Sequence, residues 1–177
     1  MIESLITSKT RIKLLFKFFI NSEIKSYLRS LEGEFGESSN SIRIELNRFE
    51  SAGLLSAQFE GNRKMYFANK AHPLYREINN SMKKVIGIDT IIQQLCDNNE
   101  NLQAIYITGE FAMGRDSKII DLALVGENID RSNIQSLLNK AKEFVSREIK
   151  FIILTWDEML RTFSNQPVLL IWKAIKD

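Results

Sequence analysis

Apolar residues recur at helical spacing in three successive stretches of the first 53 residues. These stretches predict helices over about residues 8–20, 22–36 and 38–53. The first helix has a second apolar face, formed by Leu14 and Phe18, which needs a partner elsewhere in this chain or in another copy. Because this face and the broad apolar helical surface from Ile78 to Leu95 exceed what a small domain can bury alone, we expect a homodimer.

The pattern changes after residue 53 to the alternation that is typical of strands. The stretch LLSAQFEGNRKMYFAN predicts two strands joined by Gly61 and Asn62, a pair that suits a two-residue hairpin turn. Arg63 and Lys64 follow the turn and make the tip of the hairpin basic. Three helices followed by such a hairpin predict a winged helix-turn-helix domain over residues 1–74, whose third helix would enter the major groove of DNA.

The polar face of the third predicted helix carries short or planar hydrogen-bonding side chains, which suit base edges and phosphates. Two other interpretations stay open. The domain could serve protein contacts only, and Arg43 could merely pair with Glu45 or Glu50 on the helix surface. The candidate DNA-binding residues are Ser39, Asn40, Arg43, Asn47, Arg63 and Lys64.

Residues 75–97 have a helical pattern with a wide apolar surface, and Gly87 marks a break in it. We expect a linker helix that packs on the second domain or on another subunit. His72, which precedes Pro73, is expected to have a structural role at a bend, and Cys96 to be a buried, inert thiol.

The last part of the chain alternates strands with helices. The stretches LQAIYITG, IIDLALVG and REIKFIILT predict strands, an amphipathic helix is expected over residues 131–147, and further helices are expected after Thr155. These elements predict a small α/β domain over residues 98–177. The expected fold class is therefore α+β, with a winged helix-turn-helix, a linker helix and a C-terminal α/β domain.

Composition and charge agree with two globular domains. Hydrophobic residues make up 44% of the 177, which is enough to build cores and excludes a disordered chain. Residues 1–88 hold 14 Lys and Arg against 9 Asp and Glu, whereas residues 89–177 hold 10 against 13, so the two domains are expected to have different partners. A single cysteine, no secretory signal and no apolar run near the roughly 20 residues of a membrane span predict a cytoplasmic protein.

About the first 75 residues resemble the ArsR-like winged-helix transcriptional regulators. The most specific parts of the resemblance are the G-x-S turn at residues 36–38, the apolar pattern over residues 42–54 and the wing EGNRKMYFAN. It implies a regulator that binds double-stranded DNA. The metal-sensing members of that family use clusters of cysteine and histidine, which this sequence lacks, so metal sensing is not carried over.

About 80 residues of the C-terminal half resemble the minimal nucleotidyltransferase domain, which is often fused behind such a winged helix. The family pattern is roughly G-S-x-A-R-G, a spacer, and then S-D-I-D-L followed by an apolar strand; here the chain reads GEFAMG and KIIDLALVG. The matching residues are Gly109, Ala112, Gly114, Asp121 and Leu122.

Two departures from that pattern affect the chemistry. Glu110 replaces the serine of the phosphate-binding turn and brings a negative charge towards the phosphates, and Ile119 replaces the first of two metal-binding aspartates. Only Glu148 lies near the expected third carboxylate, and Lys150 occupies a ligand position. We therefore expect an inactive pseudo-nucleotidyltransferase without catalytic residues, metal or cofactor. Its vestigial nucleotide site would consist of Gly109, Glu110, Gly114 and Asp121.

The leading hypothesis from the sequence is a homodimeric DNA-binding transcriptional regulator. Its C-terminal domain would serve dimerisation or the sensing of an effector, which could be a nucleotide or another small molecule. Two alternatives remain: an active, antitoxin-like nucleotidyltransferase, and a scaffold that uses both domains for protein contacts. The sequence does not specify the operator, the regulated genes or the sign of regulation.

Overall fold

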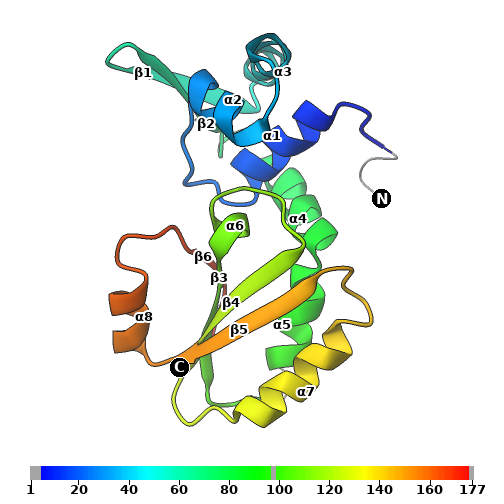
Figure 1. The fold of residues 1–177 in the computed structure, drawn as a ribbon, viewed down its shortest axis with the longest axis vertical. Helices are drawn as coiled ribbons and strands as arrows, with labels where there is room; N and C mark the ends of the chain where they lie inside the picture. The colour runs from blue at the N-terminus through cyan, green and yellow to red at the C-terminus, as the bar shows by residue number, and fades with distance from the viewer. Residues whose placement is uncertain (1–4, 97–98, 176–177) are drawn as a thin grey trace. The chain divides into compact units, whose positions relative to one another are not determined.

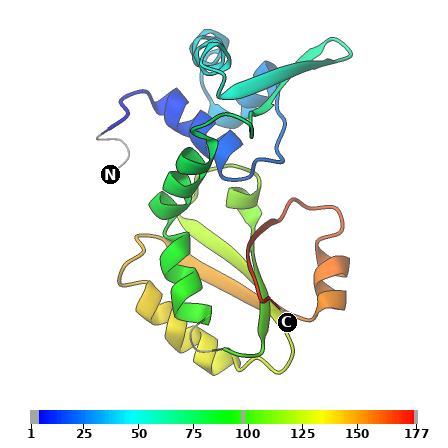
Figure 2. The same cartoon turned by 180° about the vertical axis from the view of Figure 1, so that it is seen from behind.

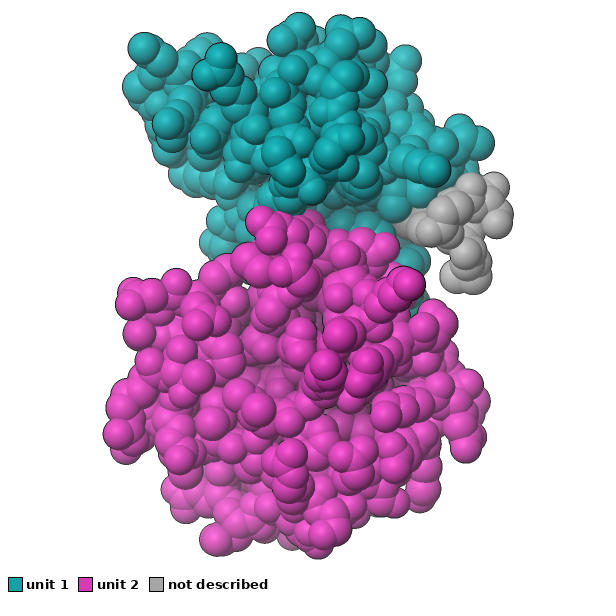
Figure 3. Space-filling view, in the orientation of Figure 1, with its two compact units in different colours: residues 1–85 teal, residues 86–177 magenta. Residues whose placement is uncertain are grey.

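The computed structural model describes residues 5–96 and 99–175 and has a mixed α+β architecture. The chain divides into two compact units, unit 1 (Met1–Val85) and unit 2 (Ile86–Asp177), coloured separately in Figure 3. The division falls inside the segment expected to be a separate linker helix, so each unit takes one part of it. Within the described residues, no helix is both long enough and apolar enough to cross a membrane.

Unit 1 consists of three helices, an antiparallel hairpin and a fourth helix, in the order predicted from the sequence (Figure 1). The N-caps of the first and third helices are Ser8 and Ser38, whose hydroxyls accept the backbone N–H groups of Arg11 and Ser41. The elements are α1 (Lys9–Phe19), α2 (Leu28–Phe35), α3 (Ser39–Ser51), β1 (Leu55–Glu60), β2 (Arg63–Ala68) and α4 (Tyr75–Ile86).

The second helix is shorter than predicted. It begins at Leu28, whereas the sequence pattern suggested a start near residue 22. The reason is a bridge to the hairpin: Ser26 N donates to Tyr66 O at 3.0 Å, and Tyr66 N donates to Ser26 O at 2.8 Å. These two long-range bonds engage both backbone polar groups of Ser26 with the hairpin, so neither is available to a helix that starts near residue 22.

The second apolar face of α1 is covered within the chain. Leu14 and Phe18 are both completely buried, so the partner of this face lies within the chain, which was one of the two expected possibilities, and the face gives no support to a second copy. The homodimer itself stays a prediction. It now rests on an apolar groove of about 430 Å³ in unit 1, whose wall includes Leu74, Ile78 and Val85.

The two helices that replace the predicted linker meet at Gly87, which has a φ of 94° and breaks the helical path as expected. Cys96, at the end of the second of them, is half-buried rather than fully buried. His72 accepts the backbone N–H of Leu74 at its Nδ1 atom over 3.1 Å, in keeping with a structural role at the bend.

Unit 2 is a four-stranded sheet with helices on both faces. The strand order is β5-β4-β3-β6; β4 and β5 are parallel, and the other neighbours are antiparallel. Figures 1 and 2 show α5 on the opposite face of the sheet from the viewer of Figure 1. The elements are α5 (Ile88–Cys96), β3 (Leu102–Thr108), α6 (Gly109–Ala112), β4 (Ile119–Gly126), α7 (Arg131–Ala141), β5 (Glu148–Leu154), α8 (Trp156–Thr162) and β6 (Leu169–Lys173).

Two predictions for the end of the chain were wrong. The helix expected over residues 131–147 ends at Ala141, and the segment expected to be helical after Thr155 contains a strand, β6, as well as α8. The β6 strand follows Pro167, which disfavours a continuing helix, and pairs with β3 at one edge of the sheet. Such a pairing joins segments more than 60 residues apart, which a local pattern does not report.

The two faces of the sheet differ in how they are covered. Alternate residues of β3 and β4, such as Ile107 and Leu122, are buried on the face of α5 and α7. On the other face, Met159 of α8 packs against Ala123 and Val125 near one end of β4. The opposite end of that face stays open to solvent.

Candidate active site on the open sheet face

The open end of the sheet carries a group of polar side chains at matching register positions. Asp121 of β4 lies opposite Thr108 of β3 and opposite Lys150 of β5. Two residues earlier on β4, Ile119 lies opposite Glu148. Because paired residues and residues two apart point to the same side of a sheet, these five side chains share one face.

The turn before α6 brings Gly109 directly against Asp121. A Cβ atom added to Gly109 would lie 2.6 Å from Asp121 Oδ2, and the φ of Gly109 is 65°. A side chain at this position would therefore collide with the carboxylate in addition to being strained. Gly109 and Asp121, which were predicted to belong to one site, lie together in the structure.

Glu110 is turned towards a neighbouring arginine. The Arg115 guanidinium donates to Glu110 Oε2 at 3.4 Å, so a cation lies beside the carboxylate that was expected to repel phosphates. Gly114, the last of the predicted nucleotide-site residues, closes the turn after α6: its N–H donates to Phe111 O at 3.0 Å.

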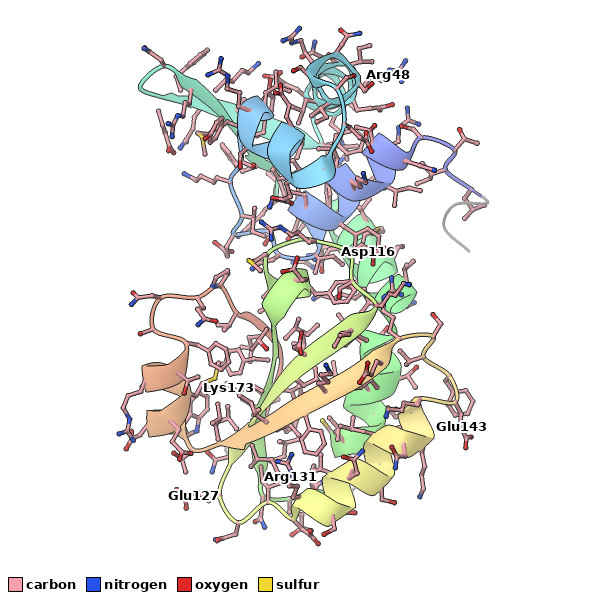
Figure 4. All side chains as sticks on the ribbon, viewed as in Figure 1. Arg48, Asp116, Glu127, Arg131, Glu143 and Lys173 are labelled. Atoms are coloured by element: carbon pink, nitrogen blue, oxygen red, sulfur yellow. The ribbon has the colours of Figure 1, made fainter. Side chains whose placement is uncertain are left out.

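Arg147 holds the loop between α6 and β4. Its guanidinium donates to Ser117 O at 2.9 Å and to Asp116 Oδ1 at 2.7 Å, and lies 5.4 Å from the centre of the Phe111 ring. Asp116 is labelled in Figure 4. These contacts fix the approach of the chain to β4 and thereby the position of Asp121.

A groove of about 540 Å³ runs along the edge strand β5 and includes Asp121. Its charged groups are two carboxylates, Asp121 and Glu148, and three cations, Arg131, Lys142 and Lys150. Within residues 5–96 and 99–175, none of these five side chains forms an ion pair with another residue. Arg131, at the start of α7 (Figure 4), stacks on the Phe151 ring at 4.9 Å. The groove thus offers both signs of charge to a ligand.

Among the lining residues of this groove that were not selected from the sequence are Arg131, Gln135 and Lys142. All three come from α7 or its C-terminal end, and their relation to β5 depends on how that helix returns to the sheet. Their charge and polarity were visible in the sequence, but a solvated helix face would have the same residues.

Unit 1 has a second groove, of about 580 Å³, between α2, α3 and the hairpin. Four of the six predicted DNA-binding residues line it, namely Arg43, Asn47, Arg63 and Lys64, together with Arg29, which the sequence argument did not select. The other two, Ser39 and Asn40, begin α3 and are not among its lining residues.

The four cations of this groove have different surroundings. Arg43 is exposed and makes neither of the two acid pairs considered from the sequence. Arg63 lies over the Tyr27 ring at 4.7 Å. Lys64, in contrast, binds Glu50 Oε2 at 2.7 Å, and this carboxylate raises the pKa of the Lys64 ammonium. Glu45 is occupied by Arg11 and Arg48.

No family model matches this chain, and no curated protein matches it. It is similar to a solved structure from Sulfolobus solfataricus described as a candidate nucleotidyltransferase, with 21% identity, a TM-score of 0.39 and coverage of 54% of this chain and 86% of that one. It is also similar to a toxin–antitoxin structure with AMP-PNP, with 21% identity, a TM-score of 0.40 and coverage of 49% of this chain and 73% of that one. A variant of the toxin–antitoxin MntA–HpeT gives 20% identity, a TM-score of 0.38 and coverage of 49% and 72%.

These findings correct one expectation from the sequence. The comparisons contradict the prediction that the protein is not an enzyme: the matched structures are described as a candidate nucleotidyltransferase and toxin–antitoxin proteins, one of them with AMP-PNP. The names agree with the nucleotidyltransferase-like part of the sequence resemblance, and none of them describes an ArsR-like regulator. The two departures that led to that prediction have charged neighbours in the structure: Glu148 lies across from Ile119, and Arg115 pairs with Glu110.

Proposed function

We propose that unit 2 binds a nucleoside triphosphate in the groove along β5 and transfers its nucleotidyl group to an acceptor hydroxyl. The observation that carries this proposal is the groove around the edge strand β5. Asp121, Glu148 and Lys150 share the open sheet face, and Arg131 and Lys142 line the same groove from the side of α7. None of these five side chains has an ion-pair partner among the described residues. Cations bind phosphate oxygens, and a carboxylate near the reacting phosphorus can accept a proton. This proposal takes up the alternative of an active, antitoxin-like nucleotidyltransferase that the sequence left open.

The acidic and the basic side chains of the groove have different roles in the proposed reaction. The acceptor oxygen forms a bond to the α-phosphorus, the bond from that phosphorus to the α,β-bridging oxygen breaks, and pyrophosphate leaves. The hydroxyl proton passes to the Asp121 carboxylate, which the Gly109 turn holds in position. Arg131, Lys142 and Lys150 neutralise the phosphate oxygens along the groove.

Enzymes of the resembled type use divalent metal ions, and the residues present fit one such ion. Within the described residues, no three acidic, histidine or cysteine side chains stand together as a metal site, so a clamp for two ions is not formed by the chain alone. Mg²⁺ commonly binds one or two carboxylates and takes its other ligands from phosphates and water. Asp121 and Glu148 would hold it, and it would supply further neutralisation of phosphate charge.

The test is an incubation of the full chain with each of the four α-labelled nucleoside triphosphates and Mg²⁺ or Mn²⁺, with cell protein or RNA as acceptor. We expect a labelled acceptor and an equal amount of pyrophosphate. Triphosphate binding without any product, over all acceptors and both ions, would contradict transfer.

We also propose that unit 1 binds double-stranded DNA through α3 and the hairpin. The observation that favours this second function is the groove that brings Arg29, Arg43, Arg63 and Lys64 together without an acidic lining residue. Duplex phosphates attract such clusters, and α3 presents Arg43 and Asn47 one turn apart for base edges.

Arg43→Ala and Asn47→Ala should each weaken binding to a selected preferred duplex by about 1–3 kcal/mol and binding to random duplex much less, because a good base contact discriminates by that amount. Affinities follow from fluorescence anisotropy after selection of the preferred site from random DNA. Arg48→Ala is the matched control, since Arg48 is also on α3 but pairs with Glu45 and does not line the groove (Figure 4). An unchanged ratio of preferred to random affinity in Arg43→Ala would remove α3 as the reading helix.

A further inference from the structure

One cation of the unit 1 groove already has an acidic partner. Lys64 Nζ lies 2.7 Å from Glu50 Oε2 and 5.1 Å from the centre of the Tyr66 ring. Glu50 stands near the end of α3 and is not a lining residue of the groove. The ion pair therefore joins the hairpin to α3 at the border of the unit 1 groove.

The other three cations of the groove differ from Lys64 in this respect. Within residues 5–96 and 99–175, Arg29, Arg43 and Arg63 form no ion pair. A phosphate that enters the groove meets three cations that are available and one whose charge Glu50 offsets. Because the Glu50 carboxylate offsets the charge of the ammonium and takes one of its three N–H donors, Lys64 attracts a phosphate less strongly while this ion pair is formed.

We propose that Glu50 is a built-in competitor of DNA phosphate for Lys64, and that it lowers the affinity of this surface for duplex DNA. The inference rests on the proposed DNA binding and adds to it a residue that sets the strength of the interaction. It also changes the expectation for Lys64: in the natural chain this lysine contributes less to phosphate binding than Arg63, although both follow the hairpin turn.

The experiment measures random-duplex binding by the full chain over a series of salt concentrations. Glu50→Gln should raise the affinity about two- to fivefold, the range expected for release of an exposed ion pair. It should also steepen the slope of log affinity against log salt by about 0.9, because one more phosphate is neutralised. Lys64→Ala should have a small effect in the natural chain and a larger one in the Glu50→Gln background.

Glu60→Gln is the matched control. Glu60 is on the same hairpin and accepts hydrogen bonds from Gln58 at 2.7 Å and Lys25 at 3.4 Å, but it does not line the groove. Both variants change the net charge equally. An equal rise in affinity for the two, or no rise for Glu50→Gln with an unchanged melting temperature, would overturn the inference. Absence of any duplex binding by the natural chain would overturn the DNA-binding proposal and this inference with it.

Discussion

Asp121→Asn should lower the rate of nucleotidyl transfer by about 10²–10⁴-fold, the contribution of a positioned proton acceptor. The change keeps the size of the side chain, so its contact with Gly109 is preserved. It removes the negative charge that, in the proposed reaction, takes the hydroxyl proton and would help to hold a divalent ion. The measurement is the initial rate of label transfer at saturating triphosphate, together with the dissociation constant of the triphosphate.

The two readouts separate chemistry from binding. Without a divalent ion, the triphosphate should bind the Asp121→Asn variant nearly as tightly as the natural chain, because Arg131, Lys142 and Lys150 remain. Asp157→Asn provides the control: Asp157 is an exposed residue of α8, and it is not a lining residue of the groove. If Asp121→Asn transferred label at the natural rate, the β4 carboxylate would have no part in the reaction.

The sequence predicted those elements whose signals are local. The Ser38 cap, the Gly61–Asn62 turn and the apolar runs of β3, β4 and β5 are each encoded within about ten residues, and the structure has them. The predictions for the start of α2 and for the segment that forms β6 were wrong, because the signals for these elements are not local. Each depends on a partner far along the chain: Tyr66 for the residues before α2, and β3 for β6.

The same distinction applies to the candidate site. Gly109 and Asp121 could be paired from the sequence because they belong to one motif with a known spacing. The role of Glu148 could not be judged, because it depends on the register between β4 and β5, which sets Glu148 across from Ile119. Likewise, Glu110 pairs with Arg115 and Lys64 pairs with Glu50, and each partner offsets the charge that a ligand would encounter. Neither ion pair could be predicted from the periodicity of the sequence.

Gly109→Ala should reduce transfer by roughly 100-fold, because a displacement of a reacting group by about 1 Å can cost that much. The new Cβ atom would lie 2.6 Å from Asp121 Oδ2, so the carboxylate or the turn must move. The left-handed backbone at this position adds a strain of about 1–2 kcal/mol. The experiment records the transfer rate and the free energy of unfolding of the same variant.

Gly61→Ala separates the strain from the collision. Gly61 has a φ of 59°, close to the 65° of Gly109, but an added Cβ atom would meet nothing within 4 Å. Gly61→Ala should therefore lose stability through the strain alone, Gly109→Ala should lose at least as much, and only Gly109→Ala should lose transfer. A Gly109→Ala protein that kept the natural rate would show that the contact between this turn and Asp121 does not position the carboxylate for the reaction. Equal losses of rate in both variants would assign the effect to general destabilisation instead.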